Sequence, residues 1–231
     1  MESRKLCFIT IGEVNDALIS EITSLVEGDV ELIHIPFILA SEDSEWKKWS
    51  NRTLQPFGGI GAGAAGCLLG HRYAWKKLIE SNFEFALVLE SDAELTNFGR
   101  DYFSNVVSQF SILDCNILHL GTHERFTASF SGFKVLNLSL RAIAKEIWER
   151  LYLKSKSPKF AERQFPFSTH AYLIKEEAAA FLVSQEVNFV FPVDVMLNSY
   201  SQVVMNKIWR CRTPVLIQRD DLVSYTRKLG R

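Results

Sequence analysis

Closely paired cysteines are missing from this chain of 231 residues. Its four cysteines, Cys7, Cys67, Cys115 and Cys211, are scattered along the chain, and three of the four stand inside apolar or strand-like runs. A free cysteine in such a run usually behaves as a small buried hydrophobic residue. The distribution therefore argues against a disulfide framework or a zinc site, and it favours a reducing compartment.

A strong net charge and a long apolar run are missing as well. The formal net charge is -1, so we expect no polyanion-binding surface and no nucleic-acid partner. No apolar stretch approaches the roughly 18 residues that a membrane-spanning helix needs. The polar start "MESRK" is unlike a signal peptide. These absences leave an ordinary globular protein, with 47% hydrophobic residues to build a core.

The first half of the chain alternates between strand and helix patterns. An apolar run at 5–12, helical spacing over 14–26 and alternation over 29–37 predict a βαβ unit. Further predicted elements are helices over 67–81 and near 99–110 and strands over 85–89 and 115–121. The pattern predicts an α/β fold with a mainly parallel first half, most simply as one domain.

The second half predicts a more varied set of elements. They are a hairpin over 126–140 turning at Ser131-Gly132, an amphipathic helix over 141–153, a basic irregular loop over 154–168, a strand over 169–174, helices over 175–185 and 191–205, and strands at 207–211 and 214–218. No internal repeat or linker separates this half from the first.

The stretch "FALVLESDAEL" raises the central question of function. An apolar run from Phe85 to Leu89 predicts a buried strand, yet it ends in Glu90, Ser91 and Asp92. Residues i and i+2 of an extended chain point to the same side, so the two carboxylates should converge while Ser91 points away. Two convergent acids at an exposed strand end either hold a metal ion or cap the next segment.

A second pattern, Gly61 to Gly66, satisfies the G-x-G-x-x-G fingerprint of dinucleotide-binding proteins. That fingerprint must follow a strand directly and open a helix, whereas the preceding "SEWKKWSNRTLQPFGG" is no strand. A nicotinamide or flavin oxidoreductase is therefore disfavoured. The glycines are expected to form either a tight, ligand-facing loop before the helix or a surface loop.

The order of these features resembles glycosyltransferase family 25, the bacterial lipooligosaccharide galactosyltransferases and their relatives. The family pattern is close to G-E-I-G-C-A-L-S-H followed by I-L-E-D-D-A. The positions in step are Gly63, Gly66, Cys67, Leu69, His71, Leu89, Glu90 and Asp92. Later, "THAYLIKEEAAAFL" and "FPVDVML" resemble two further family segments. The resemblance covers roughly residues 60–225 and is carried by three ordered motifs.

The resemblance implies a GT-A-like fold, that is, a Rossmann-like mainly parallel sheet flanked by helices with a smaller hairpin or acceptor-side region. Residues 1–120 would bind the nucleotide sugar and 121–231 the acceptor. The implied activity is an inverting, metal-dependent transfer of a hexose, galactose from UDP-galactose, to a lipooligosaccharide or related glycan or glycolipid. The implied cofactor is Mn²⁺ or Mg²⁺, and the implied location is cytoplasmic, with at most peripheral association at the inner membrane.

On the donor side, the resemblance implies that Asp92 is the first metal ligand. Glu90 is expected either to join it or to face the ribose. Donor-binding positions are expected at the end of the first strand and around the glycine motif: Thr10, Ile11, Gly63, Gly66 and His71. His71 has two interpretations, a bond to the donor or a bond to nearby backbone.

Asp194 is the predicted catalytic base, because Pro192 precedes it and a helix N-terminus should lie there. The helix dipole is expected to lower its pKa; the alternative is an ordinary first-turn aspartate. His170 is a candidate contact to the acceptor or, equally, a structural histidine, and Glu124 is a further candidate base. A basic group, Lys156, Lys159 and Arg163, would either meet an anionic acceptor or form a solvated loop.

Three positions depart from the family pattern. Ala64 and Gly70 stand where the family has Glu and Ser, and Ser91 replaces the middle Asp. They motivate an alternative from another class, an inactive nucleotide-sugar-binding module of the same fold.

Overall fold

The computed structural model describes residues 6–50, 61–123, 160–162, 169–185, 191–200 and 208–218. Its main sheet has seven strands in the order β2-β1-β3-β8-β5-β9-β7. Their bounds are β1 Leu6–Ile11, β2 Val30–Ile35, β3 Phe85–Glu90, β5 Ile117–His119, β7 Phe160–Glu162, β8 Ala171–Lys175 and β9 Ile208–Cys211. A smaller sheet has the order β4-β10-β6, with β4 Ala93–Leu95, β6 Gly121–His123 and β10 Leu216–Gln218.

The main sheet is mixed but runs mainly in one direction. β1 pairs in parallel with β2 and with β3, and β5 pairs in parallel with β9. β8 lies between β3 and β5 and is antiparallel to both, and β7 is antiparallel to β9. The predicted βαβ unit, β1-α1-β2, is confirmed with α1 at Asp16–Leu25.

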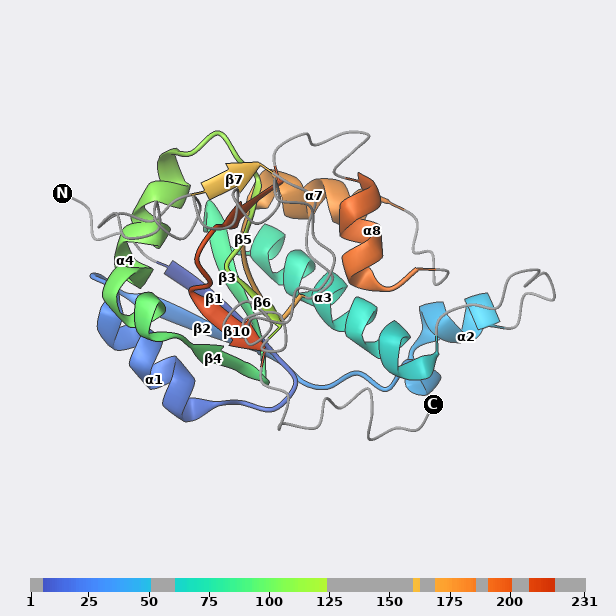
Figure 1. The fold of residues 1–231 in the computed structure, drawn as a ribbon. Helices are drawn as coiled ribbons and strands as arrows, with labels where there is room; N and C mark the ends of the chain where they lie inside the picture. The colour runs from blue at the N-terminus through green and yellow to red at the C-terminus, as the bar shows by residue number, and fades with distance from the viewer. Residues whose placement is uncertain are drawn as a thin grey trace, which may run out of the picture.

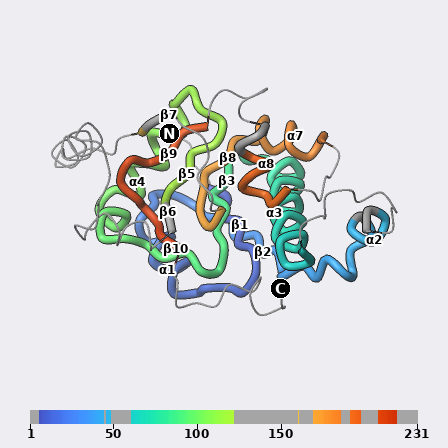
Figure 2. The backbone as a smooth tube through the Cα atoms, turned by 45° about the vertical axis from the view of Figure 1, so that its right-hand side comes forward, coloured from blue at the N-terminus to red at the C-terminus, as the bar shows by residue number. Residues whose placement is uncertain are grey.

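Helices cover both faces of the sheet (Figure 1). α1 and α4 (Asn97–Ile112) pack on one face, where the core includes Phe8, Ile22 and Phe103. α3 (Ala62–Glu80), α7 (Glu176–Ser184) and α8 (Val193–Tyr200) pack on the other, where the core includes Trp75 and Tyr172. Figure 2 shows the same arrangement from another side. The short 3-10 helix η1 (Ala40–Glu42) leads into α2 (Ser44–Ser50), which lies farther from the sheet than the other helices. The predicted α/β class is confirmed.

Local sequence explains where these elements begin. The Asn15 side chain accepts a hydrogen bond from the Leu18 amide and caps α1, and Thr96 caps α4 in the same way through the Gly99 amide. β3 is buried from Ala86 to Leu89, because strands flank it on both sides and helices cover both faces of the sheet. Gly12, with φ +92, turns the chain sharply at the end of β1.

Three predictions of local structure were wrong. α3 begins at Ala62, so the glycine motif lies in the helix and not in a loop before it. The predicted strand over 115–121 divides at Leu120 into β5 and β6, which belong to different sheets. Within the stretch 154–168, predicted to be irregular, residues 160–162 form β7. Helix ends are the least certain part of a sequence-based prediction, and the pairing of short strands depends on partners distant in the chain, which periodicity does not reveal.

Several predicted segments lie outside the described residues. They are the hairpin 126–140, the helix 141–153, Glu124 and the basic residues Lys156, Lys159 and Arg163. The division into halves at residue 120 stays a prediction.

Candidate functional site

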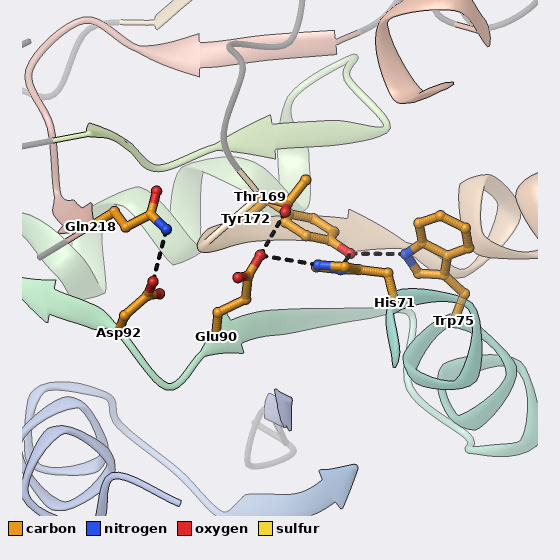
Figure 3. Close-up of polar contacts among 7 residues, drawn as sticks. All are labelled: His71, Trp75, Glu90, Asp92, Thr169, Tyr172 and Gln218. Atoms are coloured by element: carbon orange, nitrogen blue, oxygen red, sulfur yellow. Dashed lines mark hydrogen bonds and ion pairs between the residues drawn. The ribbon is translucent and has the colours of Figure 1, made fainter. Parts of the chain in front are cut away.

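Two carboxylates end β3, at the sheet edge where parallel strands present their carboxyl ends. Glu90 is the last residue of β3, and Asp92 follows in the turn before β4. Figure 3 shows both side chains on the same side of the chain, as the i, i+2 spacing predicted. Ser91 instead lies against Gly12, whose position for a Cβ atom is 3.3 Å from the Ser91 hydroxyl. In α/β sheets this edge is where ligands bind.

Glu90 is held by two donors on one of its oxygens. The Thr169 hydroxyl donates to Oε1 at 2.5 Å, and His71 Nε2 approaches the same oxygen at 3.1 Å. Burial alone would raise the pKa of Glu90, but the hydrogen bonds from His71 and Thr169 and the electrostatic attraction of His71 and His170 lower it on balance. Glu90 is therefore an ionised carboxylate whose other oxygen points to the side of Asp92 (Figure 3).

Behind His71 lies a buried chain of polar groups. Trp75 and His71 are four residues apart on α3 and face the same side, where both meet the Tyr172 hydroxyl of β8. Trp75 Nε1 donates to that hydroxyl at 2.9 Å, and His71 Nδ1 lies 2.8 Å from it. All three side chains are fully buried.

Asp92 has a different environment. The prediction that it is exposed was wrong. Only 7% of the residue is accessible, because β4 and β10 cover it. Gln218 of β10 donates to Oδ2 at 2.7 Å, while Oδ1 is buried and makes no hydrogen bond to a described residue. Burial raises the pKa of Asp92 to about 6, and the negative charge of Glu90 acts in the same direction.

Asp194 is a third carboxylate near this pair. It lies in the first turn of α8, as predicted, and its Oδ1 accepts a hydrogen bond from the Val195 amide at 2.8 Å. The predicted lowering of its pKa was wrong: burial raises it, more than hydrogen bonds from the Val195 and Asp194 amides lower it. The charge of Glu90 also raises the pKa of Asp194 and His71 lowers it, so Asp194 lies within electrostatic range of both residues.

The buried Oδ1 of Asp92, which has no hydrogen-bond partner among the described residues, indicates whether this site suits a divalent cation. A buried acceptor without a donor carries a desolvation penalty, which a cation would remove. Carboxylate oxygens are hard ligands, which suit Mn²⁺ or Mg²⁺. Asp92 together with the free side of Glu90 therefore fits a hard divalent ion.

A second group of possible ligands is Cys67, His71 and Glu90, whose ligand atoms lie within 4.8 Å of one another. Cys67 and His71 are at i and i+4 on α3. Burial and the charges of nearby carboxylates raise the pKa of the Cys67 thiol well above its ordinary value, and metals bind the thiolate. Both ring nitrogens of His71 also have hydrogen-bond partners. This cluster fits a metal less well than Asp92 does.

The two glycines predicted to bind the donor lie within α3. Gly66 has an ordinary backbone conformation, and a Cβ there would come within 2.3 Å of the Ile38 carbonyl oxygen. Gly66 thus lets α3 pack closely on the chain that follows β2. Gly63 lies half-buried in the first turn. The predicted reason for these glycines, a ligand-facing loop, was wrong, while contact with the donor stays a prediction.

The remaining predicted residues lie on the two chain segments that flank the end of β3. Ile11 is the register partner of Glu90, and the Thr10 hydroxyl lies 3.1 Å from His34 Nδ1. His170 is fully buried, packs edge-on against His119, and its carbonyl accepts a hydrogen bond from the Glu90 amide at 2.8 Å. Roles for Thr10 and Ile11 at the donor and for His170 at the acceptor stay predictions.

Four residues of the site were not identified from the sequence: Trp75, Thr169, Tyr172 and Gln218. Thr169 and Tyr172 stand in "THAYLI", a segment already singled out, so a polar residue just before a strand and a Tyr inside it were the available signals. Gln218 gave no signal of its own. It meets Asp92 only because β10 pairs with β4.

Residues 41–197 match the family described as Glycosyltransferase family 25 (LPS biosynthesis protein). The chain belongs to glycosyltransferase family 25. For a member of this family the reactants are, by class, a nucleotide-sugar donor and a glycan acceptor. The observed mixed sheet flanked by helices is consistent with the GT-A-like fold expected of the family.

One solved structure is similar over 97% of each chain, with 9% sequence identity and a TM-score of 0.46. It is described as the crystal structure of a glycosyltransferase involved in the glycosylation of the major capsid of PBCV-1. No curated protein sequence matches this family 25 member. Among its described residues, no helix has both the length and the apolar character to cross a membrane.

Proposed function

We propose that this family 25 member is an inverting, metal-dependent hexosyltransferase that moves galactose from UDP-galactose to a lipooligosaccharide or related cell-surface glycan. The observation that carries the proposal is the buried Asp92 with its unpaired Oδ1, beside an ionised Glu90 at the carboxyl end of β3. The donor sugar and the inversion come from the family resemblance. The proposed location is the cytoplasmic side of the inner membrane, with peripheral association at most.

Each carboxylate has a separate role in the proposal. Asp92, with Glu90, would hold Mn²⁺ or Mg²⁺, which when bound would neutralise charge on the leaving diphosphate. Gln218 orients Asp92 by holding Oδ2. Asp194 would accept the proton of the acceptor hydroxyl, and its raised pKa makes it a stronger base than an ordinary aspartate.

The alternative is a binding module that has lost turnover, motivated by Ala64, Gly70 and Ser91. Two of these departures have packing explanations that support an active enzyme. A Cβ at Gly70 would come within 2.9 Å of the Ile11 side chain, so a Ser at this position would require Ile11 to shift. Ser91 lies against Gly12 and points away from the two acids. Neither departure removes a residue from the carboxylate pair.

The proposal is tested by measuring melting temperatures with UDP, UDP-galactose, other UDP-sugars and NAD(P), each with and without Mn²⁺. A ligand that binds the folded state and not the unfolded state raises the melting temperature, and the increase grows with the logarithm of the ligand concentration relative to its Kd. We expect stabilisation by UDP and UDP-galactose that depends on Mn²⁺, and release of UDP when an acceptor glycan is supplied. Stabilisation by NAD(P) alone would contradict the proposal, and UDP binding without turnover of any UDP-sugar would favour the inactive module.

A further inference from the structure

The hydrogen-bonded chain from Trp75 to Glu90 has a direction that the chemistry of its groups determines (Figure 3). The indole N–H of Trp75 is a donor only, so the Tyr172 oxygen accepts it. At the other end, an ionised carboxylate is an acceptor only, so His71 Nε2 carries a hydrogen and donates to Glu90. In the neutral imidazole, Nδ1 must then accept the hydrogen of the Tyr172 hydroxyl.

The opposite tautomer of a neutral His71 would place two acceptors face to face. Its bare Nε2 would point a lone pair at the Glu90 carboxylate across the 3.1 Å that separates them. The Glu90 carboxylate is what disfavours that state, and the Tyr172 hydroxyl supports the other tautomer by donating its hydrogen to Nδ1. The ring itself is braced, because it stacks on Tyr172 with centroids 5.6 Å apart and lies 6.3 Å from the Trp75 ring.

We propose that Trp75 and Tyr172 are positioning residues that hold His71 with its Nε2–H directed at Glu90, so that the second oxygen of Glu90 stays aimed at the nucleotide-sugar donor. The role of Glu90 toward the nucleotide sugar rests on the proposed function, whereas the hydrogen bonds among Trp75, Tyr172, His71 and Glu90 do not depend on it. Thr169, on the same Glu90 oxygen, completes the restraint from the other side.

The spectroscopic test is the state of the His71 ring nitrogens, measured by NMR on ¹⁵N-histidine-labelled protein, with His71→Asn to assign its signals. Protonated and unprotonated ring nitrogens have well-separated shifts. In the neutral ring we expect Nε2 protonated and Nδ1 bare in the wild type, and a changed Nδ1 shift in Tyr172→Phe, because the hydroxyl that donates to Nδ1 is lost. A neutral ring protonated at Nδ1 in the wild type, or unchanged shifts in Tyr172→Phe, would overturn the proposal.

The kinetic test compares Tyr172→Phe with Tyr73→Phe, the same substitution at an exposed tyrosine of α3 whose hydroxyl donates to Asp43. Partners that orient a ligating group typically contribute about 10- to 100-fold to affinity or activity. We expect kcat/KM for UDP-galactose to fall by a factor in that range in Tyr172→Phe and to stay unchanged in Tyr73→Phe. A lower melting temperature with unchanged kcat/KM would mean a merely structural role and would refute the proposal.

A pair of substitutions at His71 covers the case in which Tyr172→Phe does not fold. The amide nitrogen of Gln lies near the position of Nε2 and that of Asn near Nδ1. His71→Gln should therefore retain more donor affinity than His71→Asn, and the reverse order would contradict the proposal. If the wild type binds neither UDP nor Mn²⁺, the proposed function fails, while the ring-nitrogen shifts still decide whether the relay exists.

Discussion

The two carboxylates at the end of β3, Glu90 and Asp92, are separated by one residue but differ in their hydrogen bonds and in the direction of their pKa shifts. Glu90 receives two hydrogen bonds on one oxygen, from His71 and Thr169, and two further buried side chains, Tyr172 and Trp75, stand behind His71. Gln218 donates a hydrogen bond to one oxygen of Asp92, and the other, buried oxygen has no hydrogen-bond partner among the side chains of the described residues. The pKa of Glu90 is lowered and that of Asp92 is raised to about 6. Protein donors thus restrain one oxygen of Glu90 and leave its other oxygen available, whereas the second, buried oxygen of Asp92 leaves a binding position that a cation fits.

Removing the incompletely bonded carboxylate should have the largest effect. We expect Asp92→Ala to abolish Mn²⁺-dependent UDP binding, because the carboxylate with the free buried oxygen is lost. Titration calorimetry with UDP and Mn²⁺ measures this. Glu94→Gln, which removes the next acid of the chain from β4, is the matched control and should bind normally. Undiminished metal-dependent UDP affinity in Asp92→Ala would show that Asp92 is not a ligand.

A substitution at Asp194 tests whether this third carboxylate acts as the catalytic base or as a ligand of the metal. Asp194→Asn keeps the acceptor for the Val195 amide but cannot take a proton from the sugar acceptor. We expect kcat to fall by about 10²- to 10⁴-fold, the usual contribution of a general base, while UDP-galactose affinity stays near that of the wild type.

Steady-state kinetics and donor titration separate the two quantities for Asp194. A near-normal kcat would make Asp194 a residue of the helix start only. Equal losses in donor affinity and rate would place it on the donor side, and the search for the base would turn to His170 and Glu124.

Glu90→Gln should be milder than Asp92→Ala. The Gln amide oxygen can still accept the hydrogen bonds of His71 and Thr169, while the charge is lost. We expect UDP affinity in the presence of Mn²⁺ to fall by about 10- to 100-fold, the range for groups beside a metal ligand. If Glu90→Gln is the more damaging substitution, Glu90 is the principal metal ligand and Asp92 the accessory one.

The smallest expected effect is on how the free energy of unfolding of the metal-free protein depends on pH. Because the pKa of Asp92 is raised from 3.8 to about 6 on folding, the folded state binds the extra proton, and stability is lost as pH rises through 6. A shift of this size corresponds to on the order of 1 to 3 kcal/mol. The lowered pKa of Glu90 has the opposite sign, since its stabilisation is present above pH 4.5 and is lost as pH falls.

Urea unfolding between pH 4 and pH 7 distinguishes the two carboxylates. Compared with wild type, Asp92→Asn should gain stability as pH rises, and Glu90→Gln should lose it. Parallel pH curves for wild type and Asp92→Asn would contradict the burial of an ionisable Asp92. A control in saturating Mn²⁺ should lower the apparent pKa of Asp92 and reduce its effect.

Much of the fold was predictable because it depends on local pattern. The apolar run of β3, the helical spacing of α1 and the strand-like "THAYLI" each follow from which neighbours a residue must face. The convergence of Glu90 and Asp92 follows from the two-residue period of an extended chain. Their placement at the strand end, and the family resemblance built on it, needed no knowledge of distant contacts.

The state of the site was decided only by tertiary structure. Gln218 lies 126 positions from Asp92 in the chain, and pairing of β10 with β4 brings them together and buries an aspartate that was expected to be exposed. The same holds for Asp194, where burial outweighs the local helix terminus and reverses the direction of the pKa shift. The sequence alone thus determined which groups stand at the end of β3. Solvation and hydrogen bonding depend on atoms supplied by other strands and helices, so the protonation and orientation of those groups came from the fold.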